Sequence, residues 1–144
     1  MDRKILGVDF GDVRTGLAMS DITGFLASAC GCIKGGFEKT AQGVAQFAKE
    51  NNIGKIVLGH PINMNGTLGP RSEKAQAFAK RLRELTDIEV VLFDERLSTA
   101  NAHTILNITN TRGNKRKDII DAMSASLILQ SYLDRERSTG GNNG

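Results

Sequence analysis

The sequence predicts an α/β fold in which a mixed five-stranded sheet carries helices on both of its faces. Three apolar segments, residues 4–10, 15–20 and 25–33, follow one another with turn-length gaps, which is typical of an antiparallel three-strand meander. Two later apolar segments, residues 55–59 and 88–93, each follow a stretch of helical periodicity. Strands joined through helices lie parallel in one sheet, so these two segments are expected to add parallel strands to the meander.

Turn and helix signals set the elements of the first half of the chain. A turn at residues 21–24 separates the second and third strands, and Gly35 and Gly36 end the third. Apolar residues then recur at helical spacing from Phe37, which predicts a helix to about Asn51.

The middle of the chain is expected to hold a long loop and a second helix. Residues 60–70 contain both prolines and two glycines and follow the strand at 55–59, which is typical of a loop at a strand end. Pro70 suits the first turn of a helix whose apolar stripe continues to Leu85. The strand at 88–93 comes next.

The last third is expected to be helical around a basic loop. Ser98 is a suitable N-cap for a helix that continues through Leu106. Residues 108–117 are polar and basic, and we expect them to be mobile. A final helix from Asp118 to about Arg135 is apolar on most sides, which predicts that it is largely buried.

Length and composition favour a single domain. The 144 residues are about one domain's worth, and we assign residues 1–136 to the domain and residues 137–144 to a disordered tail. No apolar run approaches the roughly 18 residues of a membrane span, and the first residues lack the apolar segment of a signal peptide. We therefore expect a cytoplasmic protein without a membrane partner. The spacing of Cys30 and Cys32 suits neither a disulfide framework nor a zinc site.

Basic residues gather in two segments. The net charge is only +3, but five of the six charged residues between Arg71 and Arg83 are basic, and residues 112–117 contain four cations. Such clusters favour a phosphate-rich partner. A solvated helix face and a basic loop without a partner would give the same pattern, so the clusters alone decide nothing.

Three carboxylates occupy positions that their apolar neighbours in the sequence predict to be buried. Asp9 and Glu95 each follow an apolar strand, and Asp121 lies among apolar residues of the final helix. An unpaired buried carboxylate costs several kcal/mol, and ligands of open α/β sheets gather at the carboxyl ends of the strands. If the final helix packs across that end, the three acids converge on a site for Mg²⁺ or Mn²⁺, with Asp118, one helical turn earlier, as a doubtful fourth ligand.

Each of these acids also has a purely structural interpretation. Asp9 could cap the turn that follows it. Glu95 could pair at the surface with Arg96 or Arg14, and Asp118 could be an ordinary acid at a helix start. A shared site explains Asp9, Glu95 and Asp121 together, but spacing alone does not prove that they converge.

Four segments resemble the signature segments of the YqgF/RuvX family. They are VDFGDVRTGLAMSD at 8–21, LGHPINMNGTLGP at 58–70, FDERLST at 93–99 and DIIDAMSASLILQSYL at 118–133. The resemblance covers about residues 3–134. That family is similar to the RuvC-type Holliday junction resolvases and shares their RNase H-like fold.

The resemblance implies a metal-dependent nuclease that acts on structured nucleic acid, chiefly in maturing the 5′ end of pre-16S rRNA. It implies Asp9, Glu95 and Asp121 as catalytic metal ligands, with two Mg²⁺ or Mn²⁺ ions and water as the nucleophile. Asp118 does not fall at a position that the signature requires. His60 stands where the family commonly has Leu, and a structural hydrogen-bonding role is the more usual one for such a residue.

Several polar residues are candidates for holding the nucleic-acid backbone. Arg14 and Arg96 could clamp a phosphate or pair with acids, and the loop around Asn63 and Asn65 could serve only as a connection. The full set of candidates is Arg14, Asn63, Asn65, Arg71, Lys74, Arg96, Arg112, Lys115, Arg116 and Lys117.

Three other functions remain open from the sequence. Cleavage of branched DNA would normally need a dimer that presents two sites, and the sequence is compatible with a monomer or a homodimer. An ATP-binding phosphotransferase of related fold would duplicate the domain, and 144 residues with one Asp-x-Gly turn argue against it. A non-catalytic nucleic-acid-binding or regulatory domain would gain nothing from acids that face phosphate.

Overall fold

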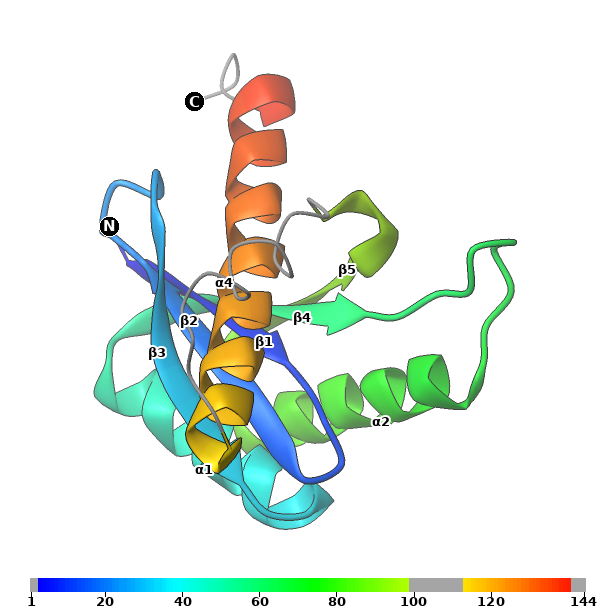
Figure 1. Ribbon diagram of the computed structural model, residues 1–144. Coiled ribbons are helices and arrows are strands. Elements are labelled where there is room, and N and C mark those ends of the chain that lie inside the picture. The colour runs from blue at the N-terminus through cyan, green and yellow to red at the C-terminus, as the bar shows by residue number, and fades with distance from the viewer. Residues whose placement is uncertain (1–2, 99–112, 141–144) are drawn as a thin grey trace.

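The computed structural model describes residues 3–98 and 113–140, and for residues 113–119, 139 and 140 it describes the backbone alone. A five-stranded sheet has the order β3-β2-β1-β4-β5 (Figure 1). Its strands are β1 Lys4–Asp9, β2 Arg14–Ser20, β3 Ala27–Lys34, β4 Ile53–His60 and β5 Glu89–Asp94. The helices are α1 Phe37–Glu50, α2 Pro70–Leu85 and α4 Gly113–Gly140, with a short 3-10 helix η1 at Glu95–Leu97.

Strand direction confirms the predicted mixture of a meander and parallel strands. β1 pairs antiparallel with β2, and β2 pairs antiparallel with β3. β4 lies parallel to β1, and β5 lies parallel to β4. The carboxyl ends of β1, β4 and β5 therefore meet at one edge of the sheet, where α/β proteins usually bind their ligands.

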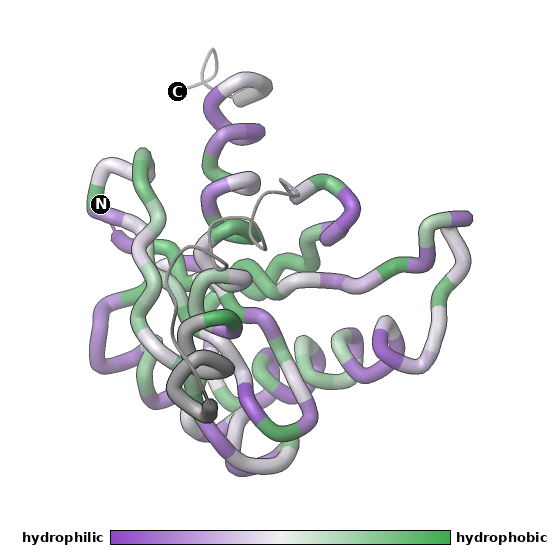
Figure 2. The backbone as a smooth tube through the Cα atoms, viewed as in Figure 1, coloured by the Kyte–Doolittle hydropathy of each residue, from purple (hydrophilic) through white to green (hydrophobic). Residues whose placement is uncertain are grey.

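The helices cover the two faces of the sheet unequally (Figure 1). α1 and α2 lie on one face, and α4 crosses the other face, over β1, β2 and β3. On the first face Phe10 stacks on Phe78 with ring centroids 4.3 Å apart, and Phe37 meets both rings edge-on. On the second face Leu129 and Ile128 of α4 pack against Val57 of β4. Figure 2 shows the hydrophobic positions concentrated in the central strands, which lie between these two layers.

The final helix is longer than the sequence predicts. Residues 113–117, expected to belong to a mobile loop, are helical, and so are residues 137–140, expected to belong to a disordered tail. Lys and Arg are good helix formers, and extending an existing helix adds one hydrogen bond for each residue that is fixed. Near the C-terminus, Arg137 donates to the backbone carbonyls of Gly24 and Phe25 and lies 4.1 Å from the Phe25 ring centroid. These contacts hold the last turns of α4 against the β2–β3 turn.

Two expectations fall outside the described residues. The helix predicted from Ser98 through Leu106 lies there, as does the basic residue Arg112. Ser98 itself ends η1, where its hydroxyl donates to the carbonyl oxygen of Glu95. Within the described part of the chain, no helix combines the length and the apolar character that crossing a membrane requires.

Candidate active site

Asp9 ends β1 between two glycines on the neighbouring strands. It pairs with Gly16 of β2, and on the other side Gly59 of β4 directly follows Leu58, the partner of Val8. A Cβ atom on Gly16 would lie 1.9 Å from the backbone oxygen of Asp121, and one on Gly59 would lie 2.7 Å from Glu95 Oε2. Glycine at both positions therefore lets α4 and the Glu95 carboxylate approach the strand that carries Asp9.

Glu95 is directed over the sheet by the turn that follows β5. The Asp94 side chain accepts a hydrogen bond from the backbone N–H of Arg96 at 2.9 Å and so caps η1. Because the chain tightens into η1 at this point, Glu95 turns back toward Gly59 instead of continuing the direction of the strand. Asp121 comes from the opposite side, on the half-buried part of α4 that packs against β2.

The three acids act on one another. Burial raises the pKa of Asp9 from 3.8 to about 7, and the charges of Glu95 and Asp121 add to the rise. Burial also raises the pKa of Glu95, and neighbouring Asp94 contributes. The Arg71 guanidinium opposes the rise at both Asp9 and Glu95, so it is a cation that faces this cluster. The site thus concentrates negative charge that only a cation or protons can neutralise.

The donor set suits a hard divalent cation, but the arrangement is open. Carboxylate oxygens are the ligands that Mg²⁺ and Mn²⁺ prefer. Among the side chains that the structure describes, those of residues 3–98 and 120–138, no three acidic, His or Cys groups lie close enough together, as they stand, to hold one ion. The acids are near enough to shift the pKa of Asp9, and binding an ion would require their side chains to draw closer. The Asp118 side chain lies outside the described part of the structure, so its role stays a prediction.

Comparisons with known proteins identify the family. The RuvX family, described as Holliday junction resolvase, matches residues 3–135. The chain belongs to the RuvX family. A relative from Ruminiclostridium cellulolyticum is 42% identical over 134 residues, covering 92% of this chain and 94% of the relative. One from Bacillus cytotoxicus is 46% identical over 134 residues, covering 91% and 98%. Both bear the name "Putative pre-16S rRNA nuclease".

Solved structures resemble this RuvX chain in fold. T. thermophilus RuvC in complex with a Holliday junction substrate has a TM-score of 0.58 at 11% identity, covering 92% of this chain and 96% of that chain. The fowlpox virus Holliday junction resolvase has a TM-score of 0.52 at 18% identity, covering 92% and 99%. The predicted RNase H-like architecture and the predicted family are therefore confirmed.

The candidate cations of the RuvX chain lie in different settings. Arg96 pairs with Asp94 at 2.8 Å, one of the two alternatives that the sequence left open. Lys74 pairs with Asp12 at 2.9 Å. Arg14 begins β2 opposite Lys34. The backbones of Lys115, Arg116 and Lys117 belong to the first turns of α4, and their side chains lie outside the described part of the structure.

The loop between β4 and α2 is held by its own polar side chains. Asn63 donates to the Thr67 hydroxyl at 2.9 Å, and the Asn65 side chain accepts from the Thr67 backbone N–H and hydroxyl. Gly66 has a φ of +88°, which suits glycine at this turn. Asn63 and Asn65 therefore shape the loop, and their contact with nucleic acid stays a prediction.

His60 ties the end of β4 to the start of α2. Its Nε2 lies 2.6 Å from the hydroxyl of buried Ser72 and 3.2 Å from Gln76 Nε2. These contacts agree with the structural hydrogen-bonding role expected for this histidine, and the role itself stays a prediction. The bond fixes the first turn of α2, which also carries Arg71.

Sequence reasoning identified the three acids but missed the two glycines beside Asp9. It placed Arg71 in a basic cluster without indicating that the charge of this residue acts on both Asp9 and Glu95. A signal for the glycines existed, because both Gly16 and Gly59 interrupt otherwise apolar strands, and a glycine within a strand often marks a close approach.

Proposed function

We propose that this RuvX chain is a metal-dependent nuclease that hydrolyses phosphodiester bonds of structured nucleic acid, with the 5′ end of pre-16S rRNA as its substrate. One observation carries the proposal: a buried aspartate at a strand end has two further acids and one arginine acting on it. Relatives that are 42% and 46% identical over almost the whole chain bear the name of a pre-16S rRNA nuclease. Such an enzyme would act in the cytoplasm.

Asp9, Glu95 and Asp121 would hold the metal, with Asp118 as a candidate fourth ligand. When bound, a pair of Mg²⁺ or Mn²⁺ ions supplies an activated water and stabilises the leaving oxygen of the phosphodiester. The chain positions these acids by the end of β1, by η1 and by α4, so that each comes from a different rigid element. Because the pKa of Asp9 is about 7, this carboxyl gives up its proton only near neutral pH, and proton and metal compete for it.

The basic residues would hold the sugar-phosphate backbone beside the acids. Arg71 and Lys74 of α2 line a pocket beside the site, and Arg14 and Arg96 lie on the elements that flank it. Residues 112–117 precede or begin the helix that carries Asp121, so their cations would add affinity from the opposite side. Contacts of this kind determine the salt dependence of binding rather than the choice of sequence.

Cleavage of branched DNA is the second candidate. The resolvase description of the family and the likeness in fold to RuvC favour it. Symmetric cutting of a junction needs two sites, so this function would require a homodimer, whereas trimming of an rRNA end needs only a monomer.

The decisive experiment compares the wild type with Asp9→Asn on pre-rRNA 5′ ends and on four-way junctions, each with Mg²⁺ and with Mn²⁺. We expect the variant to lose cleavage by at least about 1000-fold while it keeps its fold and most of its nucleic-acid binding. Asp87→Asn serves as the matched control, since Asp87 is exposed and lies just before β5, at the opposite end of that strand from Glu95.

Each result has one interpretation. Cleavage by the wild type and by Asp87→Asn, but not by Asp9→Asn, supports the proposed mechanism. Undiminished cleavage by Asp9→Asn, in a preparation free of contaminating nuclease, overturns it. Binding of both substrates without cleavage by any form would instead support a non-catalytic nucleic-acid-binding domain.

A further inference from the structure

A polar pocket lies next to the acidic cluster, on the side of α2. Its volume is about 170 Å³, and its floor is formed by the ends of β1 and β4. Its lining residues are Phe10, Gly11, Asp12, Gly59, Pro61, Arg71, Lys74 and Ala75. Gly59 also lies next to the Glu95 carboxylate, so the pocket adjoins the candidate active site.

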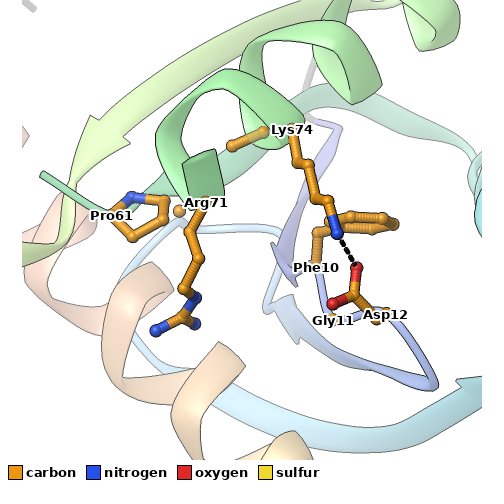
Figure 3. Close-up of a pocket in the computed structure, with 8 residues that line it drawn as sticks. Phe10, Gly11, Asp12, Pro61, Arg71 and Lys74 are labelled. Atoms are coloured by element: carbon orange, nitrogen blue, oxygen red, sulfur yellow. Dashed lines mark hydrogen bonds and ion pairs between the residues drawn. The ribbon is translucent and has the colours of Figure 1, made fainter. Parts of the chain in front are cut away.

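The two cations of the pocket extend in different directions from the first turns of α2 (Figure 3). Lys74 reaches across to Asp12, with which it forms an ion pair at 2.9 Å. Arg71 extends away from that pair, and its charge acts on both Asp9 and Glu95. Arg71 therefore lines the pocket and also acts on the acidic cluster.

Arg71 differs in its contacts from several other described cations. Lys74, Arg81 and Arg96 each have a carboxylate within ion-pair distance. Among the residues that the structure describes, Arg71 has no such partner, although it is exposed beside a cluster of acids. Its five N–H donors are thus available to a ligand, and a guanidinium suits the oxygens of a phosphate. Because Asp12 and Lys74 neutralise each other, Arg71 gives the pocket a positive charge.

We propose that this pocket is a subsite for the phosphodiester that neighbours the scissile one, with Arg71 donating to its non-bridging oxygens. The inference rests on the proposed nuclease function. The scissile phosphate would lie at the acids, and the strand would then pass Arg71 into the pocket. Asp12 is kept from repelling this phosphate by its ion pair with Lys74. The subsite fixes which phosphodiester of the strand reaches the acids.

The test measures binding, so that it does not depend on turnover. Wild-type protein first maps the cleavage position on a short oligoribonucleotide that spans the 5′ end of pre-16S rRNA, the substrate of the proposed function. A set of the same oligonucleotide, each with one uncharged methylphosphonate in place of a phosphate, is then bound to Asp9→Asn and to Asp9→Asn/Arg71→Ala. We expect Arg71→Ala to weaken binding of the unmodified strand about tenfold. One methylphosphonate, next to the cut, should weaken binding to Asp9→Asn but have no further effect when Arg71 is absent.

Two variants control for charge and geometry. Lys80→Ala removes a cation from an exposed position of the same helix and should weaken binding slightly and equally for every modified strand. Arg71→Lys keeps the charge but not the planar pair of donors, and should restore only part of the affinity. The melting temperature of each variant checks that its fold is intact.

The outcomes separate the subsite from the nuclease function. Coupling between Arg71 and one phosphate beside the cut supports the subsite. The subsite is overturned if the effects of Arg71→Ala and of the methylphosphonate add at every phosphate. It is also overturned if Arg71 is coupled to a phosphate several nucleotides from the cut. Neither result contradicts the nuclease function. If the wild type cuts nothing, the nuclease function fails, and coupling to a single phosphate then shows only that Arg71 contacts the backbone, which overturns a subsite defined by the scissile bond.

Discussion

Acidic residues have opposite roles in two regions of this molecule. Between α1 and α2, Glu38 accepts hydrogen bonds from Arg81 Nε at 2.9 Å and Nη2 at 2.8 Å, and these bonds lower the pKa of Glu38 to about 2. At the carboxyl ends of the strands, Asp9 is buried beside two other acids and its pKa rises to about 7. The first acid helps to hold two helices together, whereas the second costs stability when it ionises.

The surroundings of an acid distinguish a structural role from a functional one. Glu38 has a cation as its main partner and is exposed to solvent, so its ionised form is favoured without a ligand. Asp9 is buried and has two acids among its charged neighbours, and Arg71 only partly compensates for burial and for those acids. A protein keeps such an arrangement where binding of a cation repays the cost, which is the physical reason to assign the metal site to this end of the sheet.

The largest effect on stability is expected for Asp9→Asn in the presence of a metal chelator. The folded pKa of Asp9, about 7, lies above its ordinary value of 3.8, so its contribution to stability is full below pH 3.8 and is lost as the pH rises through 7. The variant cannot ionise at position 9. Its free energy of unfolding should therefore exceed that of the wild type by up to roughly 4 kcal/mol at pH 8, and the difference should vanish near pH 4. Urea unfolding between pH 4 and 8 measures this.

The opposite dependence of this stability difference on pH would contradict the conclusion that burial and the neighbouring acids disfavour ionised Asp9. If Asp9→Asn is no more stable than the wild type at pH 8 without metal, then ionised Asp9 has a favourable partner. Adding Mn²⁺ sharpens the test, because the ion should stabilise the wild type far more than the variant, by mass action on the folded state.

A smaller effect on stability is expected for Gly16→Ala, which should move Asp121 away from Asp9. The new Cβ would lie 1.9 Å from the backbone oxygen of Asp121, so α4 must move away from β2. Overpacking of this kind costs roughly 1–3 kcal/mol, and the displacement should also reduce cleavage because Asp121 leaves Asp9. Thermal unfolding and a cleavage assay together measure the two losses.

Gly36→Ala is the matched control for that variant. Gly36 has an ordinary φ of −81° and nothing within 4 Å of a new Cβ. As the N-cap of α1 it should lose no more than about 1 kcal/mol on the same change, and cleavage should stay unaltered. Full activity of Gly16→Ala would mean that the close approach of α4 is not required for the site.

The fold and the acids could be predicted because they depend on short-range patterns. Alternating turns and apolar runs define the meander, and acids that follow apolar strands mark the edge where Asp9 and Glu95 lie. The setting of Arg71 could not be predicted, because it depends on how the first turn of α2 packs beside β1 and η1, elements that are distant in sequence. The extension of α4 was missed because its last turn is held by contacts of Arg137 with residues more than 100 positions earlier.

The smallest effect is expected for Glu38→Gln, with a sign opposite to that of Asp9→Asn. The folded pKa of Glu38, about 2, lies below its ordinary value of 4.5, so its contribution is present above pH 4.5 and is lost as the pH falls toward 2. The variant should therefore melt slightly below the wild type at pH 7, and the difference should shrink in high salt because the pair is exposed. Melting curves at pH 7 and pH 3 check this. If Glu38→Gln instead raised the melting temperature at pH 7, ionised Glu38 would cost stability, as ionised Asp9 does. Pairing with a cation would then no longer distinguish the two regions.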